Sequence, residues 1–136
     1  AVFGVWLPLT GFEHLGLADL ARIRNALEAH RADTGGYPVQ PAFTGVLGTG
    51  DTPAATPTPG WVPGLVPTYL TALPRDRRGG GHPLEQYLYR SDGRDYKLIA
   101  HGVTDCLWVM ARQPGRPDPA RMCYAYGFWT PGATNW

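Results

Sequence analysis

The chain has 136 residues, which corresponds to one domain with a single core and argues against a multidomain enzyme. Its 12 basic and 11 acidic residues give a net charge of +1, too small for a fold whose main partner is nucleic acid or an anionic membrane. Charged residues make up only 17% of the chain, whereas 18 glycines and 14 prolines indicate long loops. The composition therefore predicts a folded, loop-rich and weakly charged domain.

The first nine residues, Ala1–Leu9, are apolar on every side and carry no charge. This run is about half of the ~20 residues that a membrane helix needs, and it lacks the basic segment and cleavage site of a signal peptide. We therefore expect neither a complete anchor nor a complete signal peptide in it. An apolar segment without a polar face must be covered by lipid or by other proteins.

The following segment has the spacing of an amphipathic helix. Its apolar positions are Leu17, Leu20, Ile23 and Leu27, and charged residues fill several positions between them. We predict a helix over residues 18–32. Helix-ending residues follow closely: Gly35, Gly36 and Pro38.

The middle of the chain predicts loops and then a hairpin. Residues Pro41–Pro59 have little periodicity, so we expect a long surface loop. Residues Trp61–Pro74 carry apolar anchors interrupted by prolines, which favours irregular coil with a short turn. Leu84–Arg90 and Asp95–His101 alternate in hydrophobicity and flank Asp92-Gly93, which predicts a β-hairpin.

A second hairpin is predicted from Cys106–Ala111 and Arg121–Phe128, which flank the proline-rich turn Gln113–Pro119. In a symmetric hairpin Cys106 lies opposite Cys123, within reach of a disulfide. One disulfide places the domain outside the cytosol. The predicted class is α+β, with an N-terminal helix packed on a small antiparallel sheet of about four strands, long loops and one disulfide.

The residues give little support for catalysis. The histidines have no metal-binding spacing, and the only serine, Ser91, lies in a predicted hairpin turn. The run Gly79–Gly81 lacks the lysine and threonine of a phosphate loop. We predict no enzyme activity, no catalytic residue, no cofactor and no established metal site. Asp105, with Asp92 and Asp95, is a weak calcium candidate whose spacing is not that of a calcium loop.

The C-terminal third is rich in aromatic residues, and two interpretations stay open. The favoured one is that alternate aromatic side chains fill the core beneath the sheet. The other is a recognition surface that stacks on a glycan or a protein. The residues of that possible surface are Trp108, Tyr124, Tyr126 and Trp129.

Three segments, taken together, resemble the type IV pilin-like family, in particular the major pseudopilin of type II secretion. The helical stretch Ala18–Pro38 ends in Asp-Thr-Gly-Gly-Tyr-Pro, similar to the family's Asp-x-Gly-x-Tyr-Pro. Tyr69-Leu-Thr-Ala-Leu-Pro74 is similar to its Tyr-Leu-x-x-Leu-Pro element. Tyr87-Leu-Tyr89 and Asp95-Tyr-Lys-Leu98 are similar to its paired strands.

In that family the N-terminal half of a long helix is a membrane anchor before assembly and the filament core afterwards. Ala1–Leu9 resembles the tail of that anchor, which divides the chain into residues 1–17 and a globular domain of residues 18–136. Pro8 resembles the family's helix-kinking proline. The side chains that the resemblance assigns to filament packing are Val2, Phe3, Val5, Trp6, Leu7, Pro8 and Leu9.

The sequence departs from the family in three places. The peptidase cleavage motif and the acidic residue near the mature N-terminus are not matched. The acidic calcium loop of the pseudopilin is not matched after His101-Gly102, where only Asp105 corresponds, so calcium is not transferred to this chain. Cys106 and Cys123 with the aromatic extension are more similar to the disulfide-bounded region of type IV pilins, which leaves pilus and pseudopilus both open.

The resemblance implies a structural subunit of a pilus-like filament that polymerises through its apolar helix. The implied partners are other copies of the chain, other pilins, the inner-membrane assembly machinery and the membrane itself, with no nucleic acid. The implied location is the inner membrane and then a periplasmic or cell-surface filament. The alternative is a minor or tip pilin, or an extracellular recognition module that binds a glycan, a nucleic acid or a protein through the aromatic C-terminal hairpin.

Overall fold

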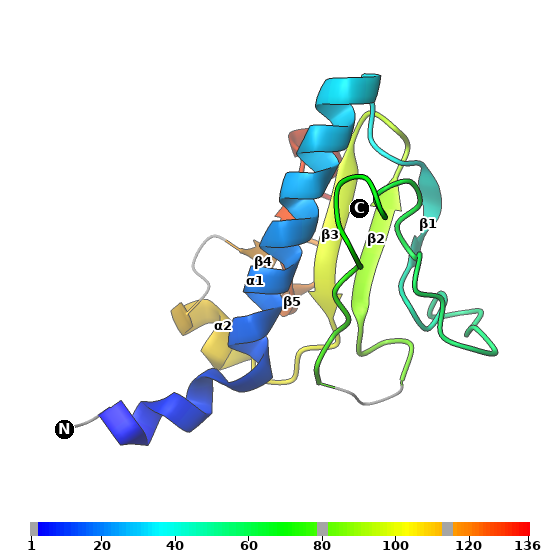
Figure 1. Ribbon diagram of the computed structural model, residues 1–136. Coiled ribbons are helices and arrows are strands. Elements are labelled where there is room, and N and C mark those ends of the chain that lie inside the picture. The colour runs from blue at the N-terminus through cyan, green and yellow to red at the C-terminus, as the bar shows by residue number, and fades with distance from the viewer. Residues whose placement is uncertain (1–2, 79–81, 113–115) are drawn as a thin grey trace.

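The computed structural model describes residues 3–78, 82–112 and 116–136, with side chains from Gly16 onward. Within those ranges the chain forms one long helix, a five-stranded antiparallel sheet, a short helix and a 3-10 turn (Figure 1). The strand order is β1-β2-β3-β5-β4. The elements are α1 (Phe3–Thr34), β1 (Gln40–Thr44), β2 (Tyr87–Ser91), β3 (Tyr96–His101), α2 (Cys106–Arg112), β4 (Pro117–Asp118), β5 (Met122–Trp129) and η1 (Pro131–Ala133).

Helix α1 confirms the helix predicted over residues 18–32 and extends beyond it at both ends. Its apolar stripe packs on the sheet, with Leu20, Ile23 and Leu27 fully buried. The helix ends where the glycine pair predicted, because Gly35 has a φ of 89° and donates its backbone N–H to the carbonyl of Arg31. Its first turns run past the end of the sheet (Figure 1).

The predicted hairpin is confirmed by β2 and β3, which pair antiparallel with Tyr89 opposite Leu98. The turn is closed by Asp92, whose Oδ1 accepts backbone N–H groups from Arg94 and Asp95. Alternation along these strands directs Tyr89 and Leu98 toward α1 and the neighbouring positions toward the opposite face. The hairpin is therefore the centre of a sheet with two different faces.

The predicted loop Pro41–Pro59 needs a correction, because its first residues belong to strand β1. Gln40 pairs with Ser91 and Thr44 with Tyr89, with an irregular register between them. A proline is tolerated there because β1 is an edge strand. The five-stranded sheet thus replaces the sheet of about four strands, while the α+β class is confirmed.

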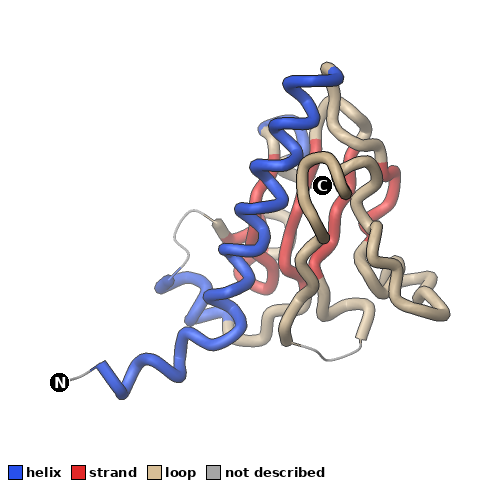
Figure 2. Tube along the Cα trace, in the orientation of Figure 1, coloured by secondary structure: helices blue, strands red, loops and turns tan. Residues whose placement is uncertain are grey.

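The coil predicted over Trp61–Pro74 is confirmed, and Figure 2 draws it as loop throughout. Although it has no regular backbone, it contributes Trp61, Val62 and Leu65 to the core shared by α1 and the sheet. Trp61 and Leu65 are almost fully buried. This segment therefore packs beside α1 and, together with it, covers the same face of the sheet.

The second predicted hairpin is wrong in its first strand, because residues 106–112 form helix α2. The helix begins after Asp105, whose carboxylate accepts the backbone N–H of Trp108. This N-cap hydrogen bond stabilises a helix and has no counterpart at the start of a strand. Strand β5 confirms the second predicted strand, but its partners are β3 and the short β4. Residues 113–115 of the predicted turn lie outside the described residues.

The predicted disulfide between Cys106 and Cys123 is present, with the two Cα atoms 4.9 Å apart. It joins α2 to β5 and not two strands of a hairpin, as the symmetric arrangement had required. The bridge therefore fixes α2 against the sheet near the first residues of β5.

Candidate functional site

The carboxylates of the weak calcium candidate are held in separate local contacts. Asp105 caps α2, Asp92 closes the β2–β3 turn, and Asp95 accepts the hydroxyl of Thr130 at 2.7 Å. Among the described residues, no three His, Cys, Asp or Glu side chains form a group able to hold a metal ion. The structure therefore does not bring these three carboxylates together.

The possible aromatic recognition surface is divided by burial. Trp108 is 5% exposed and Tyr126 is 1% exposed, so the interpretation of these two as surface residues is wrong. Both belong to the core cluster, because α2 turns Trp108 inward and β5 directs Tyr126 toward α1. Tyr124 is 53% exposed and Trp129 is half-buried, so these two remain accessible.

The sheet face opposite α1 carries a different arrangement of charged and aromatic residues. Its centre is a small apolar cluster of Leu88, Ile99 and Ala125, with Phe43 packed against it. Around that cluster lie cationic side chains on aromatic rings, and we call this surface the cation–aromatic face. It consists of Phe43, Arg90, Lys97, Arg121, Trp129 and Trp136.

Ring contacts connect the members of the cation–aromatic face. The guanidinium carbon of Arg90 lies 4.6 Å from the Trp136 ring centroid and 5.7 Å from that of Phe43. The guanidinium carbon of Arg121 also lies close to the Phe43 ring, 4.7 Å from its centroid. Such contacts attract a cation to the negative face of the ring, by about 0.5–2 kcal/mol each.

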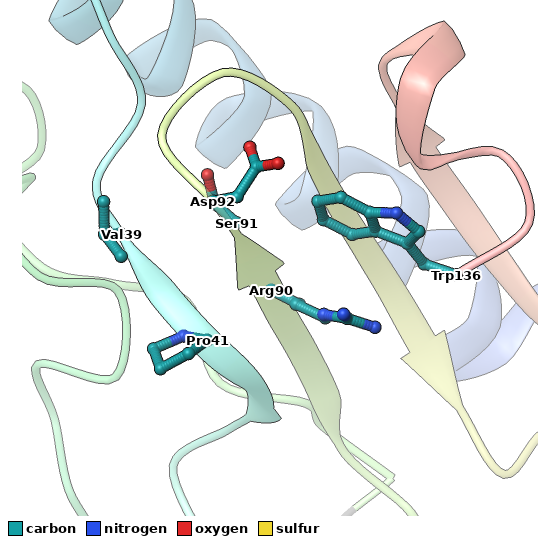
Figure 3. A pocket seen from close by; sticks show the side chains of 6 residues that line it. All are labelled: Val39, Pro41, Arg90, Ser91, Asp92 and Trp136. Atoms are coloured by element: carbon teal, nitrogen blue, oxygen red, sulfur yellow. The ribbon is translucent and has the colours of Figure 1, made fainter.

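The C-terminal segment is held on this face by backbone carbonyls. Lys97 Nζ donates to the carbonyl of Thr134 at 2.8 Å and to that of Trp136 at 3.1 Å. Arg121 Nη1 donates to the same Trp136 carbonyl at 2.8 Å. These bonds hold the C-terminal residue on the sheet, where the Trp136 indole lies beside Arg90 of β2 (Figure 3).

A pocket of about 520 Å³ opens beside that indole. Figure 3 shows Trp136 and Arg90 on one side, Val39 just before β1 and Pro41 on β1 on the other, and Asp92 at the hairpin end. Ser91 completes the lining. The volume and the mixture of apolar walls with a few polar groups are typical of small-molecule sites.

The two charged side chains of the pocket, Asp92 and Arg90, differ in their hydrogen-bond partners. The backbone N–H groups of Asp95 and Arg94 hold the pKa of the Asp92 carboxyl below its ordinary value, so Asp92 is ionised at neutral pH. Within the described parts of the chain, the Arg90 guanidinium contacts two rings but has no carboxylate or carbonyl partner. Ser91 is already occupied, because its hydroxyl donates to the carbonyl of Asp95.

No motif in the sequence distinguishes Arg90, although alternation places it on the same side of its strand as Leu88. Asp92 is predicted only as a turn residue, and Trp136 belongs to the aromatic C-terminal third without any local pattern that connects it to Asp92. Their proximity depends on the return of the chain after β5, which carries no local periodicity. The pairing of β3 with β5 is what brings the C-terminal residues near the β2–β3 hairpin, and this pairing is not visible in the sequence.

Comparison of this chain with protein-family models, with curated proteins and with solved structures finds no significant match. No helix in the described residues has both the length and the hydrophobicity needed to span a membrane.

Proposed function

We propose that the chain is a pilin-like structural subunit that polymerises through its N-terminal apolar helix into a type IV pilus or a type II secretion pseudopilus. In this proposal the domain is exported, and the filament is assembled at the inner membrane together with other pilins and the assembly machinery. The globular part faces outward, and the subunit has no catalytic role.

The observation that supports this function is the division of α1 into two parts. The α1 residues of the described core lie between Leu17 and Leu27. The apolar run that ends at Leu9 precedes them, and its described residues belong to the same helix. Figure 1 shows the first turns of α1 leading away from the sheet.

A helix of this kind gives each copy one apolar segment to be covered by others. Contacts between unlike surfaces of successive copies generate a helical filament when the rotation does not close a ring. Burial of each apolar segment among its neighbours supplies the cohesion. The disulfide between Cys106 and Cys123 would then stabilise the outward-facing domain.

The test is cryo-electron microscopy of the full-length protein expressed in its native envelope. Wild-type protein is expected to form helical filaments with the apolar helices at the axis. Trp6→Glu and Leu7→Glu place a charge in the packing segment and are expected to abolish filaments. Ala32→Glu, at an exposed position near the other end of α1, is the matched control and is expected to assemble normally.

Two results would contradict the proposal. Filaments formed equally well by Trp6→Glu would show that the apolar segment is not the assembly surface. Monomers alone from the wild-type protein would remove the structural role and favour a recognition module. Sparse filament tips that contain the protein would instead make it a minor pilin and not a major subunit.

A further inference from the structure

We propose that the pocket between Arg90 and Trp136 binds a saccharide that carries a carboxylate, the chemistry of a uronic acid. This inference goes beyond the filament proposal and does not depend on polymerisation. It follows from three features of one cavity: an unpartnered cation, an aromatic wall and an ionised acceptor at the far end.

The cation is the first feature. The Arg90 guanidinium carbon lies 4.6 Å from the Trp136 ring centroid and 5.7 Å from that of Phe43, and its N–H groups have no hydrogen-bond acceptor among the described residues. A guanidinium whose N–H donors have no acceptor can pair with the two oxygens of a carboxylate in a bidentate arrangement. Because the two rings lie close to the guanidinium and exclude water from part of it, Arg90 has less hydration to lose when an acceptor binds.

The apolar walls are the second feature. Trp136 forms one side, while Val39, which is 59% exposed, and the exposed Pro41 form another. A pyranose ring has an apolar face of C–H groups and a polar rim of hydroxyls. An indole with small apolar neighbours fits the ring face, and the cavity of about 520 Å³ accommodates more than one sugar unit.

The acceptor is the third feature, and it distinguishes among anionic ligands. Asp92 Oδ1 is occupied by two backbone N–H groups, whereas Oδ2 has no partner in the described part of the chain. A carboxylate at this end repels a ligand that is anionic throughout, such as phosphate or a polyacidic peptide. It favours a ligand with hydroxyl donors at one end and its carboxylate at the other, near Arg90.

The site is also preorganised. Trp136 is fixed through its carbonyl by Lys97 and Arg121, and Asp92 is fixed by the turn that it closes. Groups that are already in place bind without the cost of ordering them. The pocket therefore needs no rearrangement to accept a ring between Val39 and Trp136.

The experiment is calorimetric titration of the unaltered full-length protein with a disaccharide of galactose and glucuronate, which carries a single carboxylate, and, separately, with its methyl ester. The ester keeps the sugar rings and removes the charge. We expect the acid to bind at least tenfold more tightly than the ester. This comparison requires no variant, so it is independent of any effect on folding.

Variants then assign the binding to the pocket. Arg90→Gln and Trp136→Ala are each expected to weaken binding of the galactose–glucuronate disaccharide at least tenfold. Arg94→Gln is the matched control, because Arg94 is an exposed arginine on the same hairpin, and it is expected to bind as the wild type does.

Several outcomes would overturn the proposal. They are absence of binding of the galactose–glucuronate disaccharide at millimolar concentration, equal affinity for acid and ester, and unchanged affinity in a folded Arg90→Gln protein. Equal binding of N-acetyl-triglutamate would also overturn it, because the site would then recognise an acidic peptide. Equal displacement by acetate would show that a carboxylate alone is sufficient and that no sugar is recognised.

Discussion

Lys97 Nζ lies 2.6 Å from Asp118 Oδ1, and both side chains are fully buried. Burial lowers the pKa of Lys97, while the hydrogen bond and charge of Asp118 oppose that shift. Two further acceptors, the carbonyls of Thr134 and Trp136, complete the set that an ammonium group with three N–H donors requires. One buried cation thus joins β3, β4 and the C-terminal segment.

Replacing that cation alone should be costly. Lys97→Met leaves the Asp118 carboxylate with one fewer counterion in a buried site, and we expect a loss of about 3–5 kcal/mol in the free energy of unfolding. The free energy of unfolding is measured by chemical denaturation, with circular dichroism as the signal. Arg121→Gln is the control, since its side chain is 24% exposed, and should lose less. A loss below about 1 kcal/mol for Lys97→Met would contradict the role assigned to this pair.

Gly127 is required by the close pairing of β3 and β5. A Cβ at this position would overlap the carbonyl oxygen of Leu98 and would lie 2.9 Å from the Cα of Ile99. Because these are backbone atoms, the strands must separate, and we expect Gly127→Ala to cost about 3 kcal/mol or more. Gly60→Ala meets nothing within 4 Å and is the matched control. Equal thermal unfolding of both variants would refute the steric argument.

The disulfide between Cys106 and Cys123 closes a loop with a sequence separation of 17. Loop-closure entropy for this length predicts a stabilisation of about 3 kcal/mol. The double variant Cys106→Ser with Cys123→Ser should therefore unfold at lower denaturant concentration, and reduction of the wild type should reproduce the shift. If reduction leaves the midpoint unchanged, α2 is held by the packing of Trp108 and Val109 alone.

The sequence predicted those elements whose signal is local. Helical spacing from Leu17 to Leu27 and alternation around Asp92-Gly93 determined α1 and the β2–β3 hairpin, since each repeats the period of its structure several times. The short apolar run from Cys106 fits either a strand or a helix, and only the cap at Asp105 distinguishes them. The disulfide was correct although its assumed geometry was not.

The candidate site was harder to predict, because each of its parts depends on distant pairing. Strand β1 has weak alternation and a proline, so its place beside β2 follows from the unpaired edge of the hairpin. Trp136 reaches Arg90 only because Lys97 and Arg121 hold the chain end on the sheet. No spacing rule along the chain connects these residues.

Tyr37 gives the fold a dependence on alkaline pH. Its hydroxyl donates to Glu28 Oε1 at 2.6 Å, and burial followed by that hydrogen bond raises its pKa from 10.0 to about 12. Between these two values the unfolded chain has lost the tyrosine proton while the folded chain retains it. Stability is therefore fully present below pH 10 and falls as pH rises toward 12, by up to about 1.4 kcal/mol per pH unit from this group.

Tyr37→Phe removes the proton and should make the decline of stability above pH 10 shallower. At pH 7 the same variant loses the hydrogen bond to Glu28 and should be less stable by about 1 kcal/mol. The two stability curves should therefore approach each other as pH rises through 11. Denaturant unfolding at several pH values measures both curves. Parallel curves for the two proteins above pH 10 would show that the proton on Tyr37 is not coupled to folding.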